Sequence, residues 1–132
     1  MSLRRGDCLW DAGNTATGRT PHWFFILSGP ERDPACVLIV PMTSVTAEKW
    51  IDHACRLSPG DHPRVRHDSF LDYRKTIRFA CEELEDRIAT GRMKQQEPAS
   101  DALRERILVG AKESERITKK HLYVLYAQGW LA

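Results

Sequence analysis

The chain has 132 residues, a formal net charge of +2 at pH 7, 42% hydrophobic and 29% charged residues. This length fits one domain that buries its core without disulfides or metals. The small net charge excludes a strongly cationic nucleic-acid coat protein, but it allows a local basic patch.

Membrane and secreted proteins are also disfavoured. The longest apolar runs, residues 23–27 and 36–40, fall far short of the roughly 20 residues that a membrane span needs. The N-terminus becomes polar at once and has no signal-peptide apolar region. The four cysteines form no CxxC pair, and Cys8 and Cys36 lie in apolar stretches typical of small buried side chains. We expect a cytoplasmic, reduced, single-domain protein over residues 1–132.

The first half of the chain has the rhythm of a small β-barrel. A short strand is expected at 7–10, a long loop at 11–21, and an aromatic strand at His22–Ser28. After a turn at 29–34, the apolar run 36–40 predicts a central strand that ends at Pro41. Further extended segments are expected at 54–57, 69–73 and 76–79, with a polar loop at 59–67.

The second half changes to a helical period. Phe79, Leu84 and Ile88 predict a short helix that ends at Gly91. Ser100 is a suitable N-cap for a longer helix at 101–118. The segment 121–126 fits either a last strand or a helix.

Two polar clusters are candidates for a functional site. Residues 59–69 hold two histidines, two aspartates, two arginines and a serine between turn-forming residues. These side chains bind phosphate and transfer protons at neutral pH. Thr43 and Ser44 directly follow the apolar strand, where a rigid sheet would hold them. The simpler alternative is a solvated loop and a turn whose hydroxyls satisfy backbone groups.

Three segments, in this order, carry a resemblance to a known family. Residues 5–10, RGDCLW, resemble an opening strand of the form RGDIVW. Residues 22–28 and 36–44 resemble the strand pair RPVVVLS and VVVVPITS that follows it. Residues 75–77 resemble a later RTID strand. From about Arg4 to Thr118 the chain is therefore similar to the PemK/MazF/Kid family of type II toxin–antitoxin endoribonucleases.

The resemblance implies a mainly β fold with a C-terminal helix (α+β), an SH3-like small barrel of the MazF/PemK/CcdB type. It implies a homodimer that cleaves single-stranded RNA without metal or cofactor and is restrained by a cognate antitoxin. It assigns Thr43 and Ser44 to the active site and places His22 where the family has an arginine. Histidine differs from arginine because it can also transfer a proton. The family's acidic position falls nearest Asp72.

RNA cleavage requires a base for the 2′-hydroxyl, an acid for the leaving oxygen and positive charge at the phosphate. The catalytic candidates are His22, Thr43, Ser44, His62 and His67. The substrate-binding candidates are Arg64, Arg66, Ser69 and Tyr73. Trp23 and Phe70 are further candidates for stacking on unpaired bases, although the core is the favoured position for Trp23. The sequence does not decide which histidine is the acid and which the base.

Other functions remain open at this point. A metal site would use ligand types present at His53, Cys55, Asp61, His62 and His67, but their spacing matches no usual zinc motif. A serine hydrolase lacks its GxSxG turn. The main alternative is a non-catalytic SH3-like barrel that binds RNA or a protein partner.

Overall fold

The computed structural model describes residues 2–132 as a mixed α+β fold. Its strands are β1 (Cys8–Asp11), β2 (His22–Ser28), β3 (Val37–Ser44), β4 (Arg56–Leu57), β5 (Ser69–Leu71), β6 (Ile77–Phe79) and β7 (Met93–Gln96). Its helices are α1 (Cys81–Ala89), α2 (Asp101–Glu113) and α3 (Lys119–Ala127). Short 3₁₀ turns lie at Thr15–Thr17, His53–Cys55 and Tyr73–Lys75.

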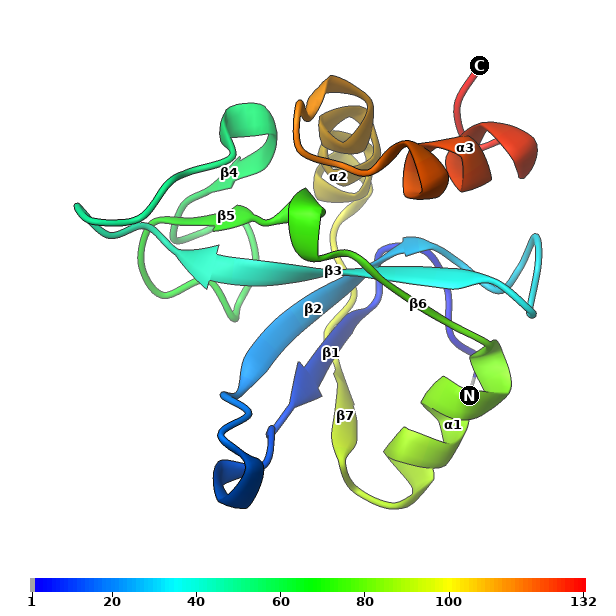
Figure 1. The fold of residues 1–132 in the computed structure, drawn as a ribbon, viewed down its shortest axis with the longest axis horizontal. Helices are drawn as coiled ribbons and strands as arrows, with labels where there is room; N and C mark the ends of the chain where they lie inside the picture. The colour runs from blue at the N-terminus through cyan, green and yellow to red at the C-terminus, as the bar shows by residue number, and fades with distance from the viewer. Residues whose placement is uncertain (1) are drawn as a thin grey trace.

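The strands form one antiparallel sheet in the order β4-β5-β3-β2-β1-β7, with β6 also paired to β3. β2 and β3 are central because their apolar and aromatic residues are suited to burial on both faces. Helices α2 and α3 lie on one face of the sheet and α1 lies on the other (Figure 1). Two cores result, one beneath α2 and α3 and one beneath α1.

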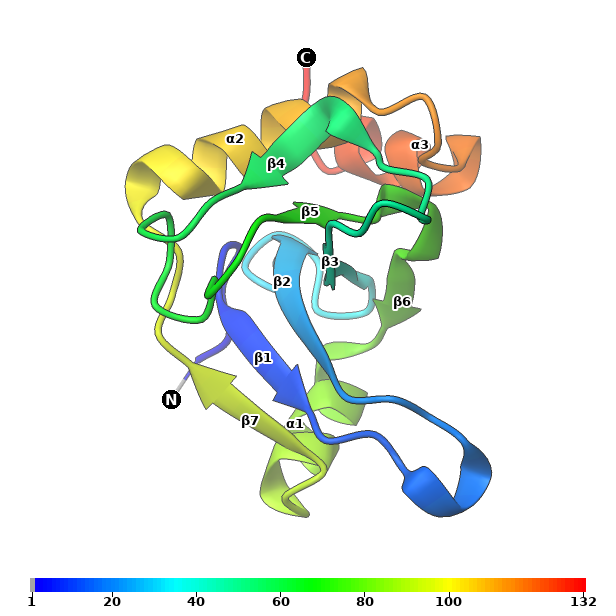
Figure 2. The same cartoon turned by 90° about the vertical axis from the view of Figure 1, so that its left-hand side faces the viewer.

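The expected closed barrel is not observed, since the sheet is open. Among residues 2–132 no strand pairing joins its end strands, β4 and β7. β4 has only two residues, and both pair with β5. Side chains of the loop between β4 and β5 cross the gap instead. His62 bonds to the carbonyl of Glu97, which directly follows β7, and Arg64 bonds to Glu97 and to Gln96, the last residue of β7. Figure 2 shows this loop beside the end of β7.

Strand β3 does not end at Pro41 as predicted, but continues to Ser44. The Pro41 carbonyl accepts a hydrogen bond from the Asp72 backbone N–H. The nitrogen and the carbonyl of one strand residue point to the same side, so the Pro41 nitrogen also faces the segment between β5 and β6. There the chain leaves the sheet in the turn Tyr73–Lys75. Because no partner there needs an N–H, proline is tolerated within the strand.

The C-terminal half departs from the prediction in two places and decides the choice left open at 121–126. The long helix ends at Glu113 rather than at residue 118, and Ser114 forms a turn by accepting hydrogen bonds from the Arg116 and Ile117 backbones. Thr118 then caps α3, which resolves the open choice at 121–126 in favour of a helix. The polar strand β7 was not expected at all, because its sequence MKQQ carries no strand signal.

Candidate active site

A pocket of about 560 Å³ opens where β2 begins and β3 ends. The loop between β4 and β5 supplies Arg64, Arg66 and His67, and residues from β1, the β1–β2 loop and the segment after β3 complete the wall. Seven of the nine site residues predicted from the sequence line it: His22, Thr43, Ser44, Arg64, Arg66, His67 and Ser69. Residues distant in sequence meet here because antiparallel pairing places the start of β2 beside the end of β3, and the end of β3 beside β5. The volume is typical of a ligand site.

The closest polar contact in the pocket joins Ser44 to His67. The Ser44 Oγ lies 2.6 Å from the His67 Nε2. Ser44 pairs with Ser69 across the sheet, and the Ser69 hydroxyl donates a hydrogen bond of 2.9 Å to the His67 carbonyl. The structure therefore gives Ser69, which is only 2% exposed, the role of holding the His67 backbone. An imidazole fixed in this way is oriented for proton transfer.

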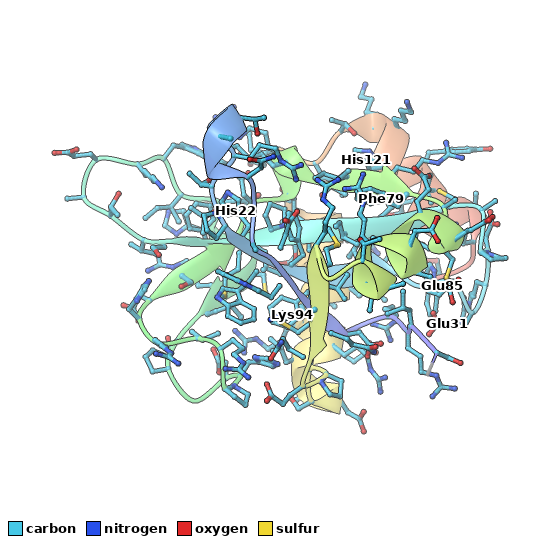
Figure 3. The ribbon with its side chains drawn as sticks, turned by 90° about the horizontal axis from the view of Figure 1, so that it is seen from below. His22, Glu31, Phe79, Glu85, Lys94 and His121 are labelled. Carbon is cyan, nitrogen blue, oxygen red and sulfur yellow. The ribbon has the colours of Figure 1, made fainter. Side chains whose placement is uncertain are left out.

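His22 enters the same pocket from the opposite face of the sheet. Successive residues of a strand point to alternate faces, so His22 and Thr43 point away from Trp23 and Ser44. The His22 ring lies edge-on to Phe24, which belongs to the core beneath α1, and Figure 3, viewed from the α1 side, shows His22 at the start of β2. Side chains from both faces of the sheet reach the pocket because it lies where β2 begins and β3 ends.

The environment of His22 favours a neutral imidazole. Burial lowers its pKa below the ordinary value of 6.5, and the positive charges of Lys75 and Lys49 act in the same direction, against Asp11. Its Nε2 is 3.1 Å from the Thr20 hydroxyl. His22 is therefore unprotonated at neutral pH and suited to accept a proton.

Three cations line the pocket and no carboxylate does, among the residues that the structure describes. Arg64 forms an ion pair with Glu97 at 3.2 Å and bonds to Gln96 at 2.7 Å. Arg66 and Lys49 are exposed, and within residues 2–132 neither forms an ion pair. This excess of positive charge favours an anionic ligand such as a phosphodiester.

Two predicted site residues lie outside the pocket. His62, expected to be catalytic, is only 3% exposed, and both ring nitrogens are engaged: Nε2 with the Glu97 carbonyl at 2.6 Å and Nδ1 with the Arg64 N–H at 3.1 Å. Tyr73, expected to bind substrate, is fully buried and donates its hydroxyl to the Ile107 carbonyl at 2.7 Å. Both side chains hold the fold and are unavailable to a ligand. Phe70, considered for base stacking, is buried as well.

Five further residues of the pocket were not expected from the sequence: Trp10, Thr20, Pro21, Met42 and Lys49. Trp10 lies directly opposite Trp23 in the β1–β2 ladder, with ring centroids 4.3 Å apart. The register of that hairpin depends on the intervening loop, so this pairing could not be predicted from the position of either tryptophan alone.

The hypothesis of a metal site at the polar loop gains no geometric support. Within residues 2–132, no group of three or more His, Cys, Asp or Glu side chains is arranged to hold a metal ion. All four cysteines are free. In the same part of the chain, no helix has both the length and the apolar character required to traverse a bilayer.

Comparison of the chain with protein-family models, with curated proteins and with solved structures finds no match.

Proposed function

We propose that this protein is a metal-independent endoribonuclease that cleaves single-stranded RNA, as a toxin-like component of a type II toxin–antitoxin system. The observation that carries the proposal is the Ser44–His67 pair, with its 2.6 Å contact, inside a pocket that residues 2–132 line with three cations and no carboxylate. The pocket supplies what the chemistry requires: imidazoles for proton transfer, hydroxyls that donate hydrogen bonds, and positive charge for the phosphate.

The reaction is an in-line displacement at phosphorus. The RNA 2′-hydroxyl attacks the adjacent phosphate, the bond to the 5′-oxygen breaks, and a 2′,3′-cyclic phosphate and a 5′-hydroxyl form. His22 is the base, because its lowered pKa keeps it neutral. His67, held by Ser44, then gives a proton to the leaving 5′-oxygen. Entry of the two imidazoles from opposite faces of the sheet suits a base and an acid placed on either side of the phosphorus.

The cations and hydroxyls stabilise the charge that develops on the phosphoryl oxygens. Arg66 and Lys49 are exposed and line the pocket. Thr43 is half-buried there and presents a hydroxyl donor on the His22 side. Donors that are already in place when charge develops are an effective source of transition-state stabilisation.

Restraint by an antitoxin, a homodimeric state and action in the cytoplasm belong to the same proposal. The antitoxin and the homodimeric state follow from the resemblance of segments 5–10, 22–28, 36–44 and 75–77 to the PemK/MazF/Kid family, and action in the cytoplasm follows from the cysteine usage.

The test is incubation of the purified protein with a long single-stranded RNA in EDTA, followed by mapping of the product ends. We expect discrete cuts that bear 2′,3′-cyclic phosphates and that disappear in His22→Ala and in His67→Ala. RNA that is bound but not cut would replace this proposal with the non-catalytic binding domain. Cleavage that requires a divalent metal would contradict the mechanism.

A further inference from the structure

Two tryptophans stand side by side in the wall of the pocket. Trp10 on β1 and Trp23 on β2 are directly paired, with ring centroids 4.3 Å apart and ring planes inclined by 43°. Both are half-buried and both line the pocket. Because paired residues in a ladder share a face, both indoles lie on the face of the sheet that carries Ser44.

Trp10 and Trp23 are more exposed than the residues that follow Trp23 on the same face of β2. Phe25 and Leu27 follow Trp23 on the same face of β2 and are completely buried in the core beneath α2 and α3. The His62 ring covers Phe25 edge-on, at 5.2 Å between centroids. This cover stops short of the two tryptophans, so they remain partly exposed beside the cations.

Arg64 makes this surface rigid. Its guanidinium carbon lies 5.4 Å from the centre of the Trp23 ring, and its nitrogens bond to Gln96 and Glu97. The Arg64 guanidinium is thus held by Gln96 and Glu97 and also contacts the Trp23 ring. A pre-ordered aromatic surface loses little entropy when a flat ligand binds to it.

Arg66 and Lys49, also in the pocket wall, have exposed charges. An open aromatic surface next to exposed cations matches the chemistry of single-stranded nucleic acid, whose bases stack and whose phosphates need positive charge. Stacking requires unpaired bases, since a duplex hides their faces.

We propose that Trp10 and Trp23 form a base-binding subsite in which an unpaired nucleobase of single-stranded RNA stacks on the indole pair while Arg66 and Lys49 contact the flanking phosphates. The inference rests on the proposed function and deepens it, by separating the part of the pocket that holds the base from the part that performs the cleavage. The subsite accepts any base, because every base has a face that can stack. It therefore contributes affinity more than sequence preference.

The experiment measures binding without cleavage. The first probe is a short single-stranded RNA methylated at every 2′-oxygen, which has no attacking hydroxyl. The second is an abasic oligomer of the same length, which keeps the phosphates and lacks the bases. Fluorescence anisotropy gives the dissociation constant of each probe for the wild type, Trp10→Ala, Trp10→Phe and Trp23→Ala. Trp50→Ala is the matched control, since Trp50 is exposed but lines a different pocket.

We expect Trp10→Ala and Trp23→Ala to weaken binding of the base-bearing probe by roughly 5- to 150-fold and to leave the abasic probe unchanged. Trp10→Phe keeps a stacking ring and most of the affinity, and Trp50→Ala binds both probes as the wild type does. Circular dichroism establishes that each variant is folded. If Trp10→Ala is not, Trp10→Leu retains apolar bulk without a ring and replaces it.

Equal losses for the two probes, or no loss for either, would overturn the subsite. If the expected pattern is found but unmodified RNA is not cleaved, the subsite stands and the nuclease proposal fails. If RNA is cleaved but the tryptophan variants bind both probes as the wild type does, the nuclease proposal stands and the subsite fails. A wild-type protein that binds neither probe would overturn both.

Discussion

The Ser44 Oγ and the His67 Nε2 lie 2.6 Å apart, although 23 positions separate them in the chain. Two backbone features bring them together. β3 continues past Pro41 to Ser44, and β5 pairs with it from Ser69 onward, so the preceding loop sets His67 above the end of β3. The exposed location makes this pair a candidate for chemistry rather than for stability.

His67→Ala should abolish cleavage without unfolding the protein. Removal of a general acid costs about 10²- to 10⁴-fold in rate, while the free energy of unfolding should change by less than about 0.5 kcal/mol, because the side chain is exposed. Turnover on a fluorogenic RNA and urea unfolding are the measurements. His53→Ala is the matched control, since His53 is exposed and lines another pocket. Normal turnover by His67→Ala would remove His67 from the mechanism.

The pH dependence of cleavage should report His22. Its pKa lies below 6.5, so the base is neutral at pH 7, and activity should fall only as the pH drops through that lower value. Lys75→Gln removes a positive charge that depresses this pKa. In that variant the acidic limb of the rate profile should move to higher pH, toward 6.5.

NMR titration of the His22 ring checks the same shift without reference to activity. Lys112→Gln, an exposed change on α2, should leave both curves in place. If the His22 titration moves in Lys75→Gln while the rate profile does not, another group is the base.

His62→Ala should behave in the opposite way to His67→Ala. Loss of the buried ring leaves the Glu97 carbonyl and the Arg64 N–H without their partners. This should cost about 2 kcal/mol or more in the free energy of unfolding. The imidazole takes no part in the proposed chemistry, so kcat should fall less than about tenfold at a temperature where the variant remains folded. A stable His62→Ala protein without activity would return His62 to the site.

Tyr73 and Gly110 should be energetically coupled. Tyr73→Phe removes a buried hydrogen bond to the Ile107 carbonyl and should cost about 1 to 2 kcal/mol. A Cβ at Gly110 would overlap the Tyr73 hydroxyl, so Gly110→Ala should cost about 1 to 3 kcal/mol despite its better helix propensity.

In the double variant the hydroxyl is absent, so Gly110→Ala should cost about 1 kcal/mol less than in the wild-type background. Part of the cost remains, because the same Cβ would lie 2.9 Å from the Cys55 Cβ. Urea unfolding of the four proteins gives the coupling directly. Strict additivity would show that Tyr73 and Gly110 do not meet as the structure places them.

The sequence by itself determined the elements whose signals are local. His22–Ser28 is a strand with the predicted bounds, since its aromatic and β-branched residues favour extended backbone. Helix α2 begins where Ser100 was expected to cap it, and the Ser100 hydroxyl accepts from the Leu103 N–H. The glycine signal for the end of α1 was also correct, since Gly91 lies just after the helix with a φ of +80°. The chemical types in the polar clusters likewise pointed to six of the residues that line the pocket: Thr43, Ser44, Arg64, Arg66, His67 and Ser69.

Only the tertiary structure decided which of these side chains meet. His62 and His67 come from the same loop, yet the fold buries one beside Glu97 and presents the other to the pocket. Pairing register placed Trp10 beside Trp23. The continuation of β3 past Pro41 placed Thr43 and Ser44 on opposite faces of the sheet. Composition and periodicity report what each residue is and how its own segment folds. Burial and contact across the sheet depend on partners distant in sequence, so only the packed structure assigns them.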